Sequence, residues 1–270
     1  MIKWVIKASG ERVPYNRNKI IRTLMRAGAD RKKANSVVSG LERELSDGAR
    51  TKEVLRHALQ HLRDVPDVAM KYNLKQAIMS LGPSGFPFEK FFAEVLRHYG
   101  FSASVGKTYQ GSRVTHEVDV AAKDKKDGKR YLVECKYHNQ PGIYTDVKTA
   151  MYVYARFLDL KKFFDVAWLA SNTKFSTDAE RYASGVGMNV TAWNYPPKNN
   201  LRELIEEQCL YPITILPAVR GFVKDKLSEA GIITTENLVE MDIDEIINLT
   251  GLTKNQIMRL QEEAKLLKKC

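Results

Sequence analysis

The chain has 270 residues and a formal net charge of +11, so it can hold two or three small domains and is expected to bind phosphate-bearing partners. It contains no apolar run long enough to span a bilayer, and its charged N-terminus lacks the pattern of a secretory signal. Three widely spaced cysteines without a CxxC pair favour neither a disulfide framework nor a zinc site. These features predict a cytoplasmic protein with no membrane partner.

The positive charge is concentrated at the N-terminal end of the chain. Residues 1–83 contain 17 Lys and Arg against 8 Asp and Glu, residues 84–212 contain 18 against 15, and residues 213–270 contain 8 against 9. Turn-forming residues interrupt the pattern at residues 82–87, and the composition shifts again after Tyr211-Pro212. We therefore predict three domains, which cover residues 1–83, 84–212 and 213–270.

The first segment begins with a short strand at residues 2–6 and a second at residues 13–15. Apolar spacing then predicts four helices: from Asn16, over residues 33–45, from Thr51 as N-cap, and over residues 67–81. A short strand lid on four helices, with the stretch VIKASGERVPYNRNKI, resembles the ATP-cone family of regulatory nucleotide-binding domains.

That resemblance covers residues 1–81 and implies an ATP or dATP effector. The residues it carries over are Val5, Lys7, Asn16, Lys19 and Thr51. Lysines that neutralise a triphosphate and a hydroxyl at a helix N-terminus are chemically suitable for this role. The alternative is a basic helical domain that binds a DNA backbone directly. No GxxxxGK[ST] motif occurs, so we expect ATP to act as an effector and not as a fuel.

The second segment is organised around residues 114–139, VTHEVDVAAKDKKDGKRYLVECKYHN, which read as two strands joined by the polar turn 123–129. Period two places Glu117, Asp119 and Ala121 on one face of the first strand, with Val118 and Val120 on the other. Glu134 and Lys136 share a face of the second strand. One antiparallel pairing can therefore gather Asp119, Glu134 and Lys136 in one place.

Two carboxylates offer oxygen ligands to a divalent cation, and a nearby lysine can orient water and offset charge on a phosphate. This layout predicts a metal-assisted phosphodiesterase. An acidic residue two positions before a lysine is common here, however, because seven such triplets occur in the chain. Spacing alone leaves open the alternative of a surface hairpin with charged side chains on its solvent-exposed face.

The flanking elements favour the enzymatic interpretation. We expect a helix over residues 88–99, a glycine-bearing loop at 106–111, a helix at 144–164, a strand at 166–170, a helix from Ser176, a strand at 188–193 and a helix at 201–208. This order, with FE…GF…D…ECK and then WLASNTKFSTDAERYA, resembles the Mrr-like branch of the PD-(D/E)xK nucleases over residues 84–207.

The nuclease resemblance implies Asp119, Glu134 and Lys136 as the catalytic set, with Glu89 as a helix-borne acidic residue near the metal. Asp119 and Glu134 would bind Mg²⁺ or Mn²⁺. The last segment, with turn residues Gly231 and Gly251, resembles helix-hairpin-helix modules. Because that segment is net acidic, contact with protein and contact with DNA are both open.

Together these patterns predict an α/β multidomain protein: a helical ATP-cone with a β lid, an α/β nuclease domain and an all-α C-terminal module. The expected function is a metal-dependent DNA endonuclease of the restriction type, regulated by ATP or dATP and working as a homo-oligomer. The alternatives are a junction-resolving repair nuclease, a nucleotide-responsive DNA-binding regulator with an inactive nuclease fold, and a nuclease that acts on RNA.

Overall fold

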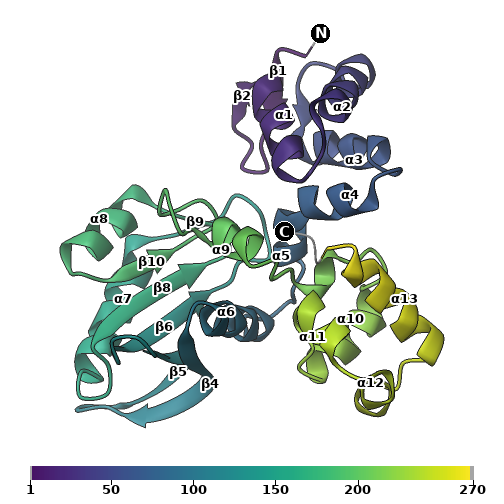
Figure 1. Cartoon of the computed structure of the whole chain (residues 1–270). Coiled ribbons are helices and arrows are strands. Elements are labelled where there is room, and N and C mark those ends of the chain that lie inside the picture. The colour runs from purple at the N-terminus through teal and green to yellow at the C-terminus, as the bar shows by residue number, and fades with distance from the viewer. Residues whose placement is uncertain (1, 268–270) are drawn as a thin grey trace.

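The computed structural model describes residues 2–267. Its N-terminal part is a group of helices beside a small sheet with strand order β2-β1-β3 (Figure 1). Its elements are β1 (Trp4–Ile6), β2 (Arg12–Pro14), α1 (Arg17–Arg26), α2 (Arg31–Glu44), β3 (Ala49–Arg50), α3 (Thr51–His61) and α4 (Pro66–Tyr72). The side chains of Asn16 and Asp30 cap α1 and α2 by accepting backbone N–H groups. Leu24, Val38 and Leu41 are fully buried in the core of this part.

Two expectations for this part are wrong in detail. Thr51 is the first residue of α3 and Arg50 is the N-cap, because the unpredicted strand β3 runs up to the helix. The helix expected over residues 67–81 is interrupted at Asn73, which separates α4 from α5 (Leu74–Met79). The interruption lets α5 leave the N-terminal core and pack elsewhere.

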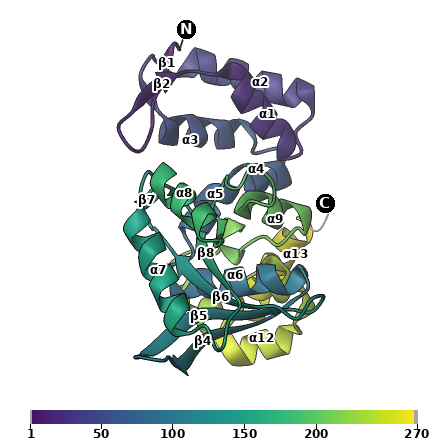
Figure 2. The same cartoon turned by 90° about the vertical axis from the view of Figure 1, so that its left-hand side faces the viewer.

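The central part is a five-stranded sheet with strand order β10-β8-β6-β5-β4, in which β4, β5 and β6 are antiparallel and β6, β8 and β10 are parallel. Apolar side chains of α6 pack on one face, and those of α7 and α8 pack on the other. Figure 2 shows α6 and α7 on opposite sides of the sheet. The elements are α6 (Phe86–His98), β4 (Phe101–Gln110), β5 (Thr115–Asp124), β6 (Arg130–Lys136), β7 (Tyr144–Thr145), α7 (Val147–Asp159), β8 (Val166–Ser171), β9 (Lys174–Phe175), α8 (Thr177–Gly185), β10 (Asn189–Thr191) and α9 (Leu201–Glu207).

The sheet departs from the sequence prediction at the strand pair β4 and β5. Residues 106–110, expected as part of a loop, continue strand β4. Val118 and Val120, expected on one face, pack in different clusters on opposite faces of the sheet. The register sets Gly106 opposite Asp119, and Gly106 has a φ of +64°, so regular alternation breaks at this point of the strand pair.

The C-terminal part consists of helices joined by short turns. Its elements are the 3₁₀ turn η1 (Ile213–Ile215), α10 (Gly221–Glu229), α11 (Thr235–Glu240), α12 (Ile243–Thr250) and α13 (Lys254–Lys265). Gly231 and Gly251 lie at helix ends with φ values of +77° and +70°, a conformation that favours glycine. Both turns therefore fall where the sequence predicted them.

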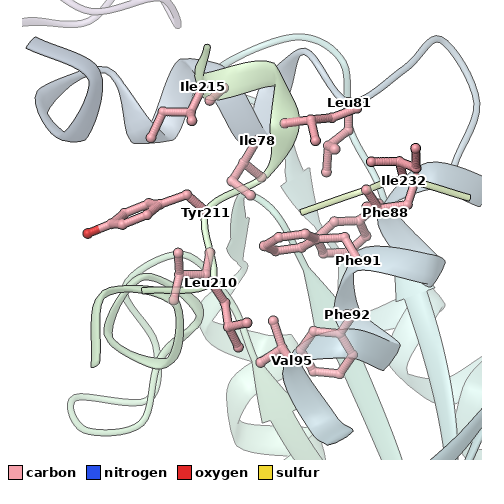
Figure 3. Packing of buried hydrophobic residues seen from close by; sticks show 14 of the residues in the cluster. Ile78, Leu81, Phe88, Phe91, Phe92, Val95, Leu210, Tyr211, Ile215 and Ile232 are labelled. Atoms are coloured by element: carbon pink, nitrogen blue, oxygen red, sulfur yellow. The ribbon is translucent and has the colours of Figure 1, made fainter. Parts of the chain in front are cut away.

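One apolar cluster joins the three parts. Buried side chains of α5, of α6 and of the segment from Leu210 onwards pack against each other around Phe88 and Ile78 (Figure 3). The hydroxyl of Thr214 donates to the backbone carbonyl of Ala77 at 2.7 Å. The domain boundaries at residues 83 and 212 stay predictions, and α5, although it precedes residue 83, packs with the nuclease-like part. Over residues 2–267, no helix is long and apolar enough to cross a membrane.

Candidate active site

The side chains predicted to act in catalysis come from three neighbouring elements. Asp119 lies in β5, Glu134 and Lys136 lie near the end of β6, and Glu89 lies in the first turn of α6. The antiparallel register pairs Val120 with Val133, and Asp119 and Glu134 are the next residues on the two strands. The backbone N–H of Cys135 donates to Asp119 Oδ2 at 2.7 Å, which fixes that carboxylate against β6. The two expected metal ligands therefore lie side by side.

Burial and mutual repulsion raise the pKa of the carboxyl groups in this cluster. Burial, followed by the charge of Asp119, raises the pKa of Glu134 to about 7. Burial, followed by the charges of Asp119, Glu134 and Glu117, raises the pKa of Glu89 to about 7. The pKa of Asp119 is also raised, chiefly by burial. The cluster thus has more negative charge than the surrounding protein neutralises.

Arg156 of α7 is the principal cation in this cluster, and the sequence interpretation missed it. Its guanidinium donates to the carboxylate of Glu134 and to the backbone carbonyl of Glu117. The side chain is buried, and its Nε has no hydrogen-bond partner among the described residues. A signal was present in the sequence, because Arg156 falls on the buried stripe of its helix with Ala150, Val153 and Phe157.

The chain that follows Lys136 is held in place. Lys136 itself is exposed at the end of β6. The hydroxyl of Tyr137 donates to the carbonyl of Met79 at 2.6 Å, and the N–H of His138 donates to Asn172 Oδ1 at 2.8 Å. Asn172 is fully buried, so it acts as a fixed support and is not a free phosphate-binding side chain. These contacts hold the end of β6 beside the carboxylates.

The donor set at this site fits a hard divalent cation. Within residues 2–267, no group of three or more His, Cys, Asp and Glu side chains is arranged to hold a metal ion. A cation would therefore take Asp119 and Glu134 as its protein carboxylate ligands and keep several waters, as Mg²⁺ commonly does. Its positive charge would also favour the ionised form of these carboxyl groups, whose pKa values are raised.

The residues predicted to bind nucleotide form two pairs, Lys7 with Thr51 and Asn16 with Lys19, and one core position. Ile6 pairs with Arg50 in the parallel strands β1 and β3. The next residues, Lys7 and Thr51, therefore lie at the same end of these two strands. Asn16 Oδ1 accepts the N–H of Lys19 at 2.8 Å, which ties these two residues to the start of α1. Lys7 also forms an ion pair with Glu11.

Val5 is the core position in this group, because its side chain is buried among the apolar residues of the N-terminal part. Its side chain therefore supports the fold, and it can offer a ligand little beyond its main chain.

Comparisons with known families recover the same three-part order. Residues 3–74 match the ATP cone domain, residues 82–203 match the restriction endonuclease family Mrr_cat, and residues 211–268 match the AF1548-like C-terminal family. The predicted combination of an ATP-cone with an Mrr-like nuclease domain is confirmed, and so is the mixed α/β fold class. The helix-hairpin-helix character of the last part stays a prediction.

Individual relatives agree with these matches. An uncharacterized protein of Archaeoglobus fulgidus is 41% identical over 174 residues, which cover 64% of this chain and 97% of that protein. The crystal structure of AF1548, a protein of unknown function, is similar with a TM-score of 0.61 and 39% identity over 67% of this chain and 97% of that one. Two proteins named transcriptional repressor NrdR, from Bradyrhizobium sp. strains ORS 278 and BTAi1, are each 38% identical over 74 residues, 24% of this chain and 45% of the repressor.

Proposed function

Because the chain belongs to the AF1548-like family and joins an ATP cone domain to a restriction endonuclease domain, we propose that it is a DNA endonuclease regulated by a nucleotide. The observation that carries this proposal is the cluster of Asp119, Glu134 and Lys136 on two paired strands. Two carboxylates with raised pKa values beside an exposed lysine suit hydrolysis of a phosphodiester bond.

The proposed roles follow from the position of each side chain. Asp119 and Glu134 hold Mg²⁺ or Mn²⁺, which when bound supplies charge for the phosphate and acidifies a water ligand. Lys136 orients the attacking water and offsets charge that develops on the phosphate. Glu89, with a pKa of about 7, is suited to accept or give a proton near neutral pH. Arg156 holds Glu134 in place when the cation is absent.

The N-terminal part is proposed to sense ATP or dATP through Lys7, Asn16, Lys19 and Thr51. The proximity of Lys7 and Thr51 at the ends of β1 and β3 supports this role, as does the match to the ATP cone domain. A nucleotide can regulate the nuclease only if it binds two states of the protein with different affinities. The helix α5 connects this part to the apolar cluster around α6. A conformational change in the ATP-cone part can therefore reach the nuclease domain through packed side chains.

The C-terminal part is proposed to be a helix-hairpin-helix-like module that contacts DNA or a second protein. Its glycine turns at Gly231 and Gly251 support the assignment. We further propose that the protein acts as a homo-oligomer, because each active site cuts one strand and two sites are needed to cut a duplex. We also propose that it works in the cytoplasm.

One observation favours a second candidate function. Arg156 contacts Glu134, and an arginine that permanently occupies a metal ligand would leave the nuclease fold inactive. The protein would then be a nucleotide-responsive DNA-binding regulator. The two functions differ in one respect that can be measured, because only a nuclease releases shortened strands.

The test compares labelled DNA and labelled RNA with Mg²⁺, with and without ATP and dATP. The nuclease function predicts cleavage of DNA that Lys136→Ala abolishes, with a rate that changes when nucleotide is added. Cleavage of RNA alone would contradict the choice of DNA as substrate. Binding of DNA without cleavage on plain, methylated and branched substrates would favour the regulator.

A further inference from the structure

A cleft lies between the N-terminal part and the nuclease domain, away from the carboxylates of the candidate active site. Its volume is about 480 Å³, and its walls come from α1, α4, α5, α9 and the segment after β10. Both views show α9 beside α5 (Figures 1 and 2). The cleft therefore exists only because the two parts pack together.

Cations dominate the lining of this cleft. One carboxylate, Glu206, faces six cationic side chains, which are Lys19, Arg22, Arg26, Lys71, Lys75 and Arg202. Glu206 is already shared, because Arg26 contacts it at 3.2 Å and Arg202 at 3.6 Å. In the part of the chain from residue 2 to residue 267, Lys19, Arg22 and Lys75 form no ion pair within 4.0 Å. The cleft thus has an excess of positive charge that the single carboxylate of Glu206 does not balance.

Lys75 is one of the cationic side chains that line the cleft. Its ammonium group lies over the indole of Trp193, 5.8 Å from the ring centre, yet its side chain remains accessible from the cleft. Burial of the ammonium group, followed by the charges of Lys174 and Lys19, lowers the pKa of Lys75. Like charges gathered in one place are costly without an anion, so the cluster is suited to a ligand that brings several negative charges.

The cleft and the candidate active site share one edge of the central sheet. Lys136 pairs with Ser171 at the ends of the parallel strands β6 and β8, and Thr191 pairs with Ala170 at the end of β10. The N–H of Trp193 donates to the carbonyl of Thr173 at 3.0 Å, which keeps the segment after β10 on this edge. Two strand spacings, about 10 Å, separate β6 from β10.

We propose that this cleft is a phosphate-binding groove, built jointly by the N-terminal part and the nuclease domain, that holds the sugar-phosphate backbone of the nucleic acid beside the bond to be cut. This inference rests on the proposed function. Backbone phosphates of one strand follow each other at about 3.4 Å along a duplex, so about three nucleotides bridge the two sites. A free nucleotide offers the same phosphate chemistry. Lys19 is the one residue of the proposed nucleotide-binding set that lines this cleft, whereas Lys7 and Thr51 lie at the ends of β1 and β3. The backbone is favoured because the cleft adjoins the active-site edge of the sheet.

The experiment measures binding of a labelled DNA duplex by the full chain at several salt concentrations without divalent cations, so that cleavage does not interfere. The test variant is Arg22→Gln with Lys75→Gln, which removes both charges and keeps polar side chains. The matched control is Lys125→Gln with Lys126→Gln, two exposed lysines on the turn between β5 and β6. Melting temperatures of both variants near the wild-type value show that each is folded.

The test variant is expected to bind DNA at least about 10-fold more weakly, and the slope of log K against log salt is expected to fall by about two. The control pair is expected to change the affinity and the slope much less. Wild-type affinity and slope in the test variant would overturn the inference. So would a variant that loses ATP binding but keeps DNA binding, because the phosphates would then come from a nucleotide.

The outcome separates this inference from the proposed function. Weaker DNA binding by the test variant, combined with a wild-type protein that cleaves no DNA, supports the groove and refutes the nuclease. Normal DNA binding by the test variant, combined with cleavage by the wild type, refutes the groove and supports the nuclease.

Discussion

At the scale of single residues, Glu134 has two competing partners. Arg156 neutralises it in the metal-free protein, and a divalent cation beside Asp119 would neutralise it in the active one. The strand period shows that Asp119 and Glu134 could come together, and the resemblance to the PD-(D/E)xK nucleases gives them their predicted role. Neither identifies Arg156, which lies on a distant helix and reaches the site only through the tertiary fold.

The contact between Arg156 and Glu134 makes a prediction for stability. The two side chains are only 10% and 17% exposed, so Arg156→Gln leaves a charged or protonated carboxyl group without its partner. We expect a loss of about 3 kcal/mol in the free energy of unfolding, measured by urea denaturation. The control is Arg130→Gln, which breaks the exposed pair with Asp165 and should cost far less. Equal losses in both variants would show that the Arg156 contact contributes little.

The raised pKa values make a prediction for pH dependence. The pKa of Glu134 rises from 4.5 to about 7 on folding, so between these values the folded protein binds more protons than the unfolded one. Stability without metal therefore falls as the pH rises through this window. Melting temperatures of the metal-free protein at several pH values measure the fall. Glu134→Gln should make the fall smaller, and Glu89, whose pKa is also raised to about 7, should keep part of it. A wild-type melting temperature that rises over the same window would contradict the assignment.

At the scale of elements, local patterns identify the helices with clear caps and the hairpin of β5 and β6. They fail at β4, because Gly106 and Gly111 suggest a loop when only the sequence is considered. The neighbouring strand β5 keeps this stretch extended through a long antiparallel ladder. They also fail at Asn73, where a continuous apolar period hides the change of direction between α4 and α5.

Gly106 provides the test at this scale. Its φ of +64° is one that other residues adopt with strain, although a Cβ at this position would meet no neighbour within 4 Å. Gly106→Ala should therefore lower the free energy of unfolding by about 1 kcal/mol through the backbone alone. Gly185→Ala is the matched control, because Gly185 lies in open space in α8 and has no positive φ. A loss in the control equal to that in Gly106→Ala would rule out the backbone explanation.

At the scale of the whole molecule, the three parts share one apolar cluster, and this sharing could not be predicted from the sequence. The turn-forming residues 82–87 marked a boundary, but the burial of α5 against α6 depends on contacts that no local pattern contains. The order of the three parts was predictable because each part has its own motif. Their mutual packing was not.

Two truncated chains test where the nuclease domain begins. The chain 73–270 keeps α5, whereas the chain 84–270 removes five buried residues of the shared cluster: Leu74, Ala77, Ile78, Met79 and Leu81. Fully burying a large apolar side chain contributes about 1.5–3 kcal/mol, so we expect the shorter chain to melt far lower or to aggregate. Melting temperatures decide the question. Equal stability of both chains would favour the predicted boundary at residue 83.

The central claim is that Asp119, Glu134 and Lys136 form a metal-dependent nuclease site. The most direct measurement is the rate of plasmid DNA cleavage over a range of Mg²⁺ concentrations, for the wild type, Glu134→Gln and the surface control Glu240→Gln. We predict cleavage that requires Mg²⁺, a loss of at least about 100-fold in Glu134→Gln, and a normal rate in the control. Cleavage without Mg²⁺, or an equal rate in Glu134→Gln and the wild type, would contradict the claim.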